Sequence, residues 1–265
     1  MRGNWLFILF LLFACKKKQD FASIEVIGHA AMGLENVNSV YHDNTLEAIE
    51  LACSMEGSDG IEIDVQLSKD GELFLFHDER LDEETNGTGC IYDKPNDELM
   101  QVRYSTVAGE RLAKLTEIST DWLKNKSIFL DIRHYSACQP IEIPVLTMID
   151  AINQTHFKNP DGFNVNCILS TEAWLDDFIQ AGFPTYYNVQ SYAMCTTALE
   201  NYPNLEGFVI KNHEITKEEV AWIRQTGKKV YIFEVRSPKG IREALGKFPD
   251  GLITDDLRAT LIEKY

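Results

Sequence analysis

The chain has 265 residues, of which 45% are hydrophobic and 25% are charged, an ordinary composition for a globular protein with one large core. Acidic residues number 41 against 25 lysines and arginines, so the formal net charge at pH 7 is −16. This balance argues against nucleic-acid binding and against a membrane surface held by charge alone. An acidic protein that handles an anionic substrate needs a local cation, either a metal or placed basic groups.

The amino-terminal sequence MRGNWLFILFLLFAC is typical of an export signal. Its apolar run, residues 5–13, is too short to span a bilayer. The run ends in LFAC, which resembles a bacterial lipoprotein cleavage site. We therefore predict a lipoprotein signal peptide over residues 1–14, lipidation of Cys15, and a linker over residues 15–22. The protein would then be an exported bacterial lipoprotein of the periplasm or cell envelope, anchored to the membrane through Cys15. The alternative is an ordinary secretory signal with an incidental cysteine.

Five further cysteines are widely spaced, and none of them forms a CxxC pair, which argues against a zinc ribbon. Their odd number means that at least one stays unpaired, and the spacing leaves the pairing open. They are Cys53, Cys90, Cys138, Cys167 and Cys195.

From residue 23 onward, strand-like and helix-like segments alternate without an internal repeat or a low-complexity tract. Most strand candidates are short, β-branched or aromatic, and nearly continuously apolar, as in a parallel sheet covered by helices. The strand candidates are residues 24–28, 60–66, 72–77, 127–132, 166–170, 185–189, 207–210, 229–235 and 251–254. Helix candidates between them include residues 45–54, 174–180, 217–225 and 238–245.

One pair of strand candidates, residues 60–66 and 72–77, is too close in sequence to be parallel. Only LSKDGE separates them, Asp70-Gly71 is a strong hairpin turn signal, and a parallel crossover needs about a dozen residues or more. The remaining eight strands can close a barrel. We therefore predict an α/β fold over residues 23–265, a (β/α)8 TIM barrel with a small antiparallel hairpin added after strand 2.

The hairpin carries polar residues inside an apolar context. With Asp70 and Gly71 as the two turn residues, Asp64 lies directly opposite His77, and Glu62 shares the face of Asp64. Buried carboxylates are rare unless they are paired or bind a metal. The alternative is a pair of exposed carboxylates on an edge hairpin.

Two other strand ends favour the buried site. The strand at 127–132 repeats the pattern with Asp131 and Arg133, and the opening strand ends in His29. In a TIM barrel these strand ends meet where active sites lie. Asp255 and Asp256 follow the last strand and could cap a helix or reach the site, and we expect them to cap a helix.

Several motifs in order resemble the glycerophosphodiester phosphodiesterases: strand-end Gly-His, Asn-Thr opening a helix, GIEIDV, a hairpin and HD, then FLDIR, KKVYIFEV and GLITDD. The resemblance extends over about residues 24–257, and the EID…HD hairpin is its most specific part. It implies a (β/α)8 barrel that hydrolyses a phosphodiester with a divalent metal and two histidines.

Carried over by position, the resemblance makes Glu62, Asp64 and Asp131 the ligands of one divalent cation, Ca²⁺ or Mg²⁺, and His29 and His77 the catalytic acid/base pair. The residue types suit these roles. Hard cations prefer carboxylate oxygens, and histidine exchanges protons near neutral pH.

The chain departs from the family at several positions. The arginine that usually follows the first histidine is Ala30, the usual Pro-Glu before Asn-Thr is His42-Asp43, the third metal ligand is Asp131 in place of glutamate, and Arg133 replaces a lysine. We expect Arg133 to bind the phosphate and so to compensate in part for the missing arginine. Phe233 stands where the family often has tryptophan and is expected to line the alcohol pocket; the alternative is a role in the barrel core.

The preferred interpretation is a lipid-anchored phosphodiesterase that splits a glycerophosphodiester, a small-molecule or lipid-derived substrate, into an alcohol and a phosphomonoester. One alternative is a phospholipase D-like enzyme that acts on lysophospholipids. The other is a binding lipoprotein that has lost catalysis. The acidic surface makes nucleic acid a poor candidate substrate.

Overall fold

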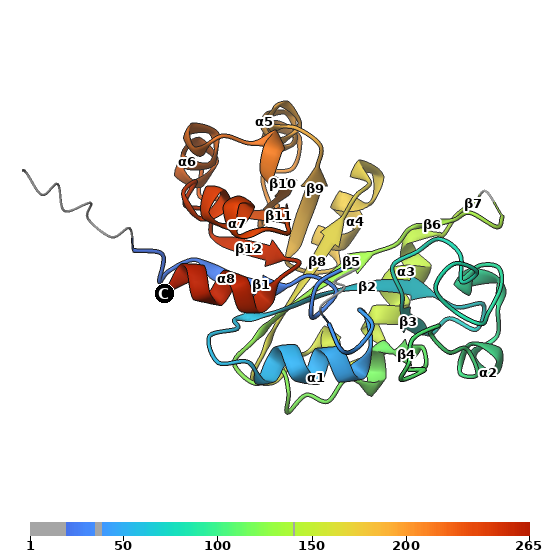
Figure 1. The fold of residues 1–265 in the computed structure, drawn as a ribbon. Helices are drawn as coiled ribbons and strands as arrows, with labels where there is room; N and C mark the ends of the chain where they lie inside the picture. The colour runs from blue at the N-terminus through green and yellow to red at the C-terminus, as the bar shows by residue number, and fades with distance from the viewer. Residues whose placement is uncertain (1–19, 35–38, 140) are drawn as a thin grey trace, which may run out of the picture.

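Eight parallel strands close into a barrel in the computed structural model, which describes residues 20–34, 39–139 and 141–265. The ring runs β1-β12-β11-β10-β9-β8-β5-β2, and pairing of β1 with β2 closes it (Figure 1). This confirms the predicted (β/α)8 barrel. The barrel strands are β1 (Glu25–Gly28), β2 (Gly60–Leu67), β5 (Ser127–Ile132), β8 (Asn164–Leu169), β9 (Thr185–Val189), β10 (Gly207–Lys211), β11 (Lys229–Val235) and β12 (Gly251–Thr254).

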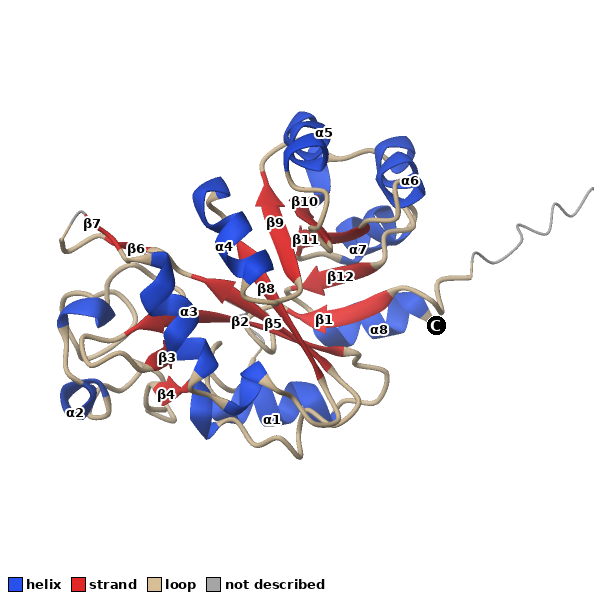
Figure 2. Ribbon diagram, turned by 180° about the vertical axis from the view of Figure 1, so that it is seen from behind, coloured by secondary structure: helices blue, strands red, loops and turns tan. Residues whose placement is uncertain are grey.

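Helices cover the outside of the ring (Figure 2). Four helices begin where a side chain accepts a backbone N–H: Thr45, Thr216, Ser237 and Asp256 are the caps. The helices are α1 (Leu46–Ser54), α2 (Asn96–Leu99), α3 (Val145–Asn153), α4 (Leu175–Gln180), α5 (Tyr192–Asn201), α6 (Lys217–Gln225), α7 (Pro238–Leu245) and α8 (Leu257–Lys264). Short 3₁₀ helices are η1 (Ile91–Asp93), η2 (Leu115–Glu117), η3 (His156–Lys158), η4 (Glu172–Trp174) and η5 (Asn212–Glu214).

The hairpin after β2 is antiparallel as predicted, but its predicted register was wrong by one residue. Gln66 pairs with Phe74, and the Phe76 N–H donates to the Asp64 carbonyl at 3.2 Å, so Asp64 faces Phe76 and not His77. The cause is the turn. Three residues, 69–71, form the loop in place of two, and Gly71 adopts a φ of 86°, as in a type I turn followed by a bulge.

Strand β3 (Leu73–Leu75) leads into an added segment that has a core of its own. This segment contains β4 (Ala113–Lys114) and α2, and it lies at one side of the barrel (Figure 1). Its core is separate from that of the barrel and consists of Phe74, Phe76, Leu81, Ile91, Leu99, Val102, Tyr104 and Leu112. The predicted hairpin is therefore the start of a larger insertion.

A disulfide joins this insertion to the chain after β5. Cys90 and Cys138 are bonded, with a Cα–Cα distance of 5.8 Å, whereas the three remaining described cysteines are buried and free. Cys138 lies between the strands of a short ribbon, β6 (Tyr135–Ser136) and β7 (Ile141–Glu142). The sequence had left this pairing open.

Inside the barrel, a layer of apolar and aromatic side chains separates the two ends of the strands. It is formed by Ile27, Phe129, Ile168, Tyr186, Val209, Tyr231 and Ile253. Side chains thus fill the middle of the barrel, and the polar groups at one end are separated from those at the other.

The predicted signal peptide and Cys15 lie outside the described residues, as does most of the predicted linker. Within the described part of the chain, none of the helices has the length and apolar character needed to cross a bilayer.

Candidate active site

Three carboxylates meet at the carboxyl ends of two adjacent strands. Asp64 on β2 pairs in register with Asp131 on β5, and Glu62 lies two residues before Asp64 on the inner face. Glu62 is 2% exposed and Asp64 is fully buried. One oxygen of each carboxylate lies within 4.8 Å of the others. The structure thus brings together the three residues that the sequence analysis predicts as metal ligands.

Asp64 is held by two partners. Arg133 donates from Nε to Asp64 Oδ1 at 3.0 Å and from a second guanidinium nitrogen to the same oxygen, and Asn44 Nδ2 donates to Oδ2 at 2.9 Å. Burial opposes ionisation of Asp64, but the Arg133 guanidinium, the two histidines and the Asn44 hydrogen bond together outweigh it and lower the pKa of Asp64 below its ordinary value. Arg133 also lies 3.5 Å from Asp131, so its charge is placed at the carboxylate cluster.

At the other two carboxylates, favourable partners do not outweigh burial and the neighbouring negative charge. Burial and the neighbouring Asp64 raise the pKa of Glu62 to about 8, and burial raises the pKa of Asp131. Glu62 Oε2 accepts the Ala30 N–H at 2.9 Å, whereas Asp131 Oδ1 is buried without a hydrogen-bond partner among the described residues. An all-oxygen set with an unpaired buried anionic oxygen fits a hard divalent cation such as Ca²⁺ or Mg²⁺.

Ala30 stands at the position where the family resemblance leads us to expect arginine. Ala30 and Ala31 both adopt positive φ angles, 44° and 76°, in the turn that presents the Ala30 N–H to Glu62. The backbone at this position therefore contacts the carboxylate cluster, and its side chain supplies no guanidinium.

His29 lies against the same cluster. Its Nδ1 contacts Asp255 Oδ1 at 2.6 Å, and its Nε2 lies 3.8 Å from Glu62. Burial lowers the pKa of His29, but the hydrogen bond to Asp255 and the charge of Glu62 outweigh burial and raise it to about 9. We expected Asp255 to cap a helix; it contacts His29 instead, and the capping residue is Asp256.

His77 approaches the carboxylates from the insertion. Its Nδ1 contacts Asp78 Oδ1 at 2.8 Å, and His77 and Arg133 line a cavity of about 130 Å³. The charge of His77 is close enough to favour the ionised forms of Asp64 and Asp131. The two predicted catalytic histidines thus lie at the same group of carboxylates, although the register that placed His77 opposite Asp64 was wrong.

Phe233 packs edge-on against His29, with ring centroids 6.4 Å apart. Both line a small cavity of about 30 Å³ together with Glu62, Asp131 and Asn188. Asn188 is a residue of this cavity that the sequence analysis missed, because a single asparagine at the end of a short strand carries no motif.

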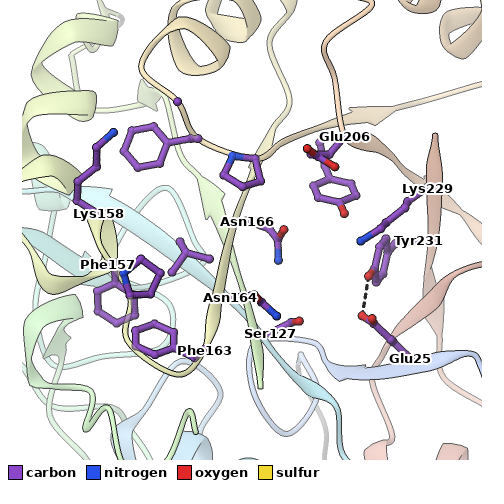
Figure 3. A pocket seen from close by; sticks show the side chains of 16 residues that line it. Glu25, Ser127, Phe157, Lys158, Phe163, Asn164, Asn166, Glu206, Lys229 and Tyr231 are labelled. Atoms are coloured by element: carbon purple, nitrogen blue, oxygen red, sulfur yellow. Dashed lines mark hydrogen bonds between the residues drawn. The ribbon is translucent and has the colours of Figure 1, made fainter. Parts of the chain in front are cut away.

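A larger cavity, about 440 Å³, lies at the opposite end of the barrel (Figure 3). Glu25, Ser127 and Lys229 line it at the amino ends of their strands, and the Tyr231 hydroxyl donates to Glu25 at 2.6 Å. Active sites of TIM barrels lie at the carboxyl ends, so we assign the candidate site to the smaller cavities beside the carboxylates.

One other described group could be considered as metal ligands, namely Cys90, Asp93 and Cys138. Both of its sulfur atoms are in the disulfide, so they offer no thiolate to a metal. Among the described residues, Glu62, Asp64 and Asp131 are therefore the group that fits a cation.

Solved structures share this fold. A putative glycerophosphoryl diester phosphodiesterase from Agrobacterium tumefaciens superposes with a TM-score of 0.76 at 18% identity and covers 91% of this chain and 97% of its own. A phosphodiesterase from Oleispira antarctica superposes with a TM-score of 0.75 at 23% identity over 92% of this chain and 99% of its own. These likenesses support the barrel.

Curated relatives are similar to this chain in sequence. A glycerophosphodiester phosphodiesterase from Caldanaerobacter subterraneus subsp. tengcongensis is 27% identical over 227 residues, which are 81% of this chain and 88% of the relative. One from Bacillus altitudinis is 28% identical over 230 residues, 81% of this chain and 89% of the relative. A model of the glycerophosphoryl diester phosphodiesterase family matches residues 33–259. The chain therefore belongs to the glycerophosphoryl diester phosphodiesterase family.

Proposed function

We propose that this protein hydrolyses glycerophosphodiesters to an alcohol and a phosphomonoester, with one divalent cation, Ca²⁺ or Mg²⁺, held by Glu62, Asp64 and Asp131. The observation that carries the proposal is the group of three carboxylates, two of them buried and Asp131 half-buried, with His29 at 3.8 Å from Glu62. The names of the Caldanaerobacter and Bacillus relatives support the reaction. The Oleispira enzyme was solved with the product sn-glycerol-3-phosphate, which supports the substrate class.

The two histidines are arranged for proton exchange. Asp255 engages Nδ1 of His29 and Asp78 engages Nδ1 of His77, which leaves the Nε2 atom of each ring as the site for taking or giving a proton. One histidine would take the proton of the attacking hydroxyl or water, and the other would protonate the leaving alkoxide. A bound cation would supply Lewis-acid chemistry by withdrawing charge from the phosphoryl oxygens.

Arg133 and Phe233 would contact the substrate. Arg133 is fixed against Asp64 by its Nε–H and a second N–H, with 32% of its side chain exposed, so it can present another donor to a phosphoryl oxygen. Phe233 packs on His29 at the rim of the small cavity and would cover the alcohol portion.

The test is release of phosphomonoester from glycerophosphocholine and glycerophosphoethanolamine. We expect turnover that EDTA abolishes, that added Ca²⁺ or Mg²⁺ restores, and that His77→Ala reduces by about 10²- to 10⁴-fold. His156→Ala is the matched control, since His156 lies in η3, beside residues of the opposite cavity. Turnover of lysophosphatidylcholine alone would favour the phospholipase D-like alternative. A protein that binds cation but hydrolyses neither class would be a binding protein.

We also propose that the protein is an exported lipoprotein anchored through Cys15. The sequence before residue 20 supports the export signal, and the Cys90–Cys138 disulfide fits an oxidising compartment outside the cytosol. In a bacterial host, Cys15→Ser is expected to move the protein from the membrane fraction to the soluble fraction. A variant that stays in the membrane fraction would contradict the anchor.

A further inference from the structure

Two buried oxygen atoms without partners face the same cavity. Among the described residues, six buried side-chain polar atoms lack a hydrogen-bond partner, and Asp131 Oδ1 and Asn188 Oδ1 are two of them. Both residues line the cavity of about 30 Å³ beside His29 and Glu62. Leaving an acceptor buried and unpaired is unfavourable, so two of them at one small cavity indicate that it receives an occupant.

Asn188 reaches this cavity from a strand that carries none of the three carboxylates. It lies on β9, which is opposite β1 in the ring, whereas the three carboxylates come from the adjacent strands β2 and β5. The Asn188 Nδ2 donates to Ser170 Oγ at 3.2 Å, which leaves the buried amide oxygen as the group that Asn188 can offer to the cavity.

The remaining walls of the cavity are apolar, formed by Ile168, Val209, Ile253 and Phe233. They offer no proton donor to the unpaired oxygens, whereas His29 lines the same cavity and its Nε2 lies 3.8 Å from Glu62. A cavity of this volume accommodates one small ion or one or two waters. A cation satisfies several such acceptors at once without bringing an acceptor of its own, and Ca²⁺ and Mg²⁺ accept neutral carboxamide oxygens alongside carboxylates.

We infer that Asn188 supplies a fourth protein oxygen to the cation site and so sets its affinity and position. The inference rests on the proposed function, since it takes the cation at Glu62, Asp64 and Asp131 as given. Asn188 adds an oxygen without adding a fourth negative charge. The site keeps its charge of three carboxylates and gains a contact from the wall that the carboxylates do not reach.

The experiment measures Ca²⁺ and Mg²⁺ binding to the metal-free full chain by calorimetry, with the melting temperature recorded in EDTA and in excess cation. Asn188→Leu keeps the approximate size and removes the oxygen. We expect its cation Kd to rise by roughly 10- to 100-fold, as for other supporting groups of metal sites. Its melting temperature in EDTA should equal or exceed that of the wild type, because the variant no longer buries an unpaired oxygen.

Asn188→Asp tests the inference from the other side. It keeps the shape and adds a charge, so it should tighten cation binding and lower the melting temperature in EDTA through repulsion from Glu62 and Asp131. Asn166→Leu is the matched control, because Asn166 also lies on a barrel strand but lines the cavity at the amino end (Figure 3). Its cation Kd should stay within twofold of the wild-type value.

Either of two results would overturn the inference. If Asn188→Leu binds the cation as tightly as the wild type or more tightly, the amide instead donates to the carboxylates or holds a water. If the wild type binds neither cation, the inference fails together with the proposed cation. A wild type that binds cation but hydrolyses no glycerophosphodiester contradicts the proposed function alone, and the Asn188 variants still decide the inference.

Discussion

The two ends of the barrel treat buried polar groups in opposite ways. At the amino end, the Tyr231 hydroxyl donates to Glu25, and lysine, carboxylate and amide side chains line a cavity of about 440 Å³ (Figure 3). At the carboxyl end, Glu62 and Asp131 are buried with raised pKa values beside a cavity of only about 30 Å³. Crowded charge distinguishes the candidate site, and cavity size does not.

The difference has an energetic meaning. Three carboxylates within 4.8 Å repel one another in the absence of a cation, and one arginine offsets only part of that repulsion. In the absence of a cation, this repulsion lowers the stability of the folded protein, a cost that is common at functional sites. The amino end has no such cluster among the described residues, and its hydrogen bonds serve stability.

Glu62→Gln should show this contrast with the largest effect. Loss of a cation ligand removes several kcal/mol of transition-state stabilisation, so turnover should fall by at least about 100-fold. In EDTA above about pH 8, where Glu62 is ionised, the melting temperature should nevertheless rise, because a neutral amide removes the repulsion with Asp64 while its oxygen can still accept the Ala30 N–H. A lower melting temperature in EDTA would contradict the claim that Glu62 is destabilising in the metal-free protein.

The sequence predicted the carboxylates because their positions follow strand periodicity. Glu62 and Asp64 share one face of β2, and Asp131 repeats the pattern on the neighbouring strand, so barrel topology alone brings them together. The strand bounds at 127–132, 185–189, 229–235 and 251–254 also agree with the structure. Apolar strands between helices are a strong local signal.

What the sequence did not predict depends on closure of the ring or on turn geometry. Asp255 contacts His29 across 226 residues, and Asn188 lines the cavity from β9, which is adjacent to neither β2 nor β5, so no local pattern places either side chain at the site. The position of His77 was predicted from a two-residue Asp-Gly turn. Asp-Gly also suits a three-residue loop with Gly71 at positive φ, and only the folded hairpin distinguishes the two.

Breaking the disulfide should give the next effect in size. Cys90 and Cys138 are 48 residues apart and connect the insertion to the chain after β5, both at the carboxyl end. Cys138→Ser should lower the free energy of unfolding by about 3 kcal/mol, measured by urea denaturation. Reductant should destabilise the wild type and leave the variant unchanged. Equal effects on both proteins would mean that the disulfide is not the source of the stability.

Arg133→Met should destabilise the metal-free protein by about 2 kcal/mol, because it leaves the buried Asp64 carboxylate without its charged partner. The Arg133 side chain is 32% exposed, so solvent reduces this cost below that of a fully buried ion pair. Saturating cation should restore more stability to the variant than to the wild type. Arg236→Met is the control, since Arg236 pairs with Asp255 but is more exposed. If cation leaves the difference unchanged, Arg133 does not offset the charge that the cation would neutralise.

Tyr231→Phe should give the smallest effect and lies at the other end of the barrel. Removing the hydroxyl loses one hydrogen bond to Glu25, so unfolding should become easier by about 1 kcal/mol. Cation Kd and turnover should not change, because the apolar interior layer lies between Tyr231's hydroxyl and the carboxylates. A double-mutant cycle with Glu25→Gln isolates the pair from other changes. A change in cation affinity in Tyr231→Phe would show that the two ends of the barrel are coupled through that layer. The claim that the amino end serves stability and the carboxyl end serves function would then be wrong.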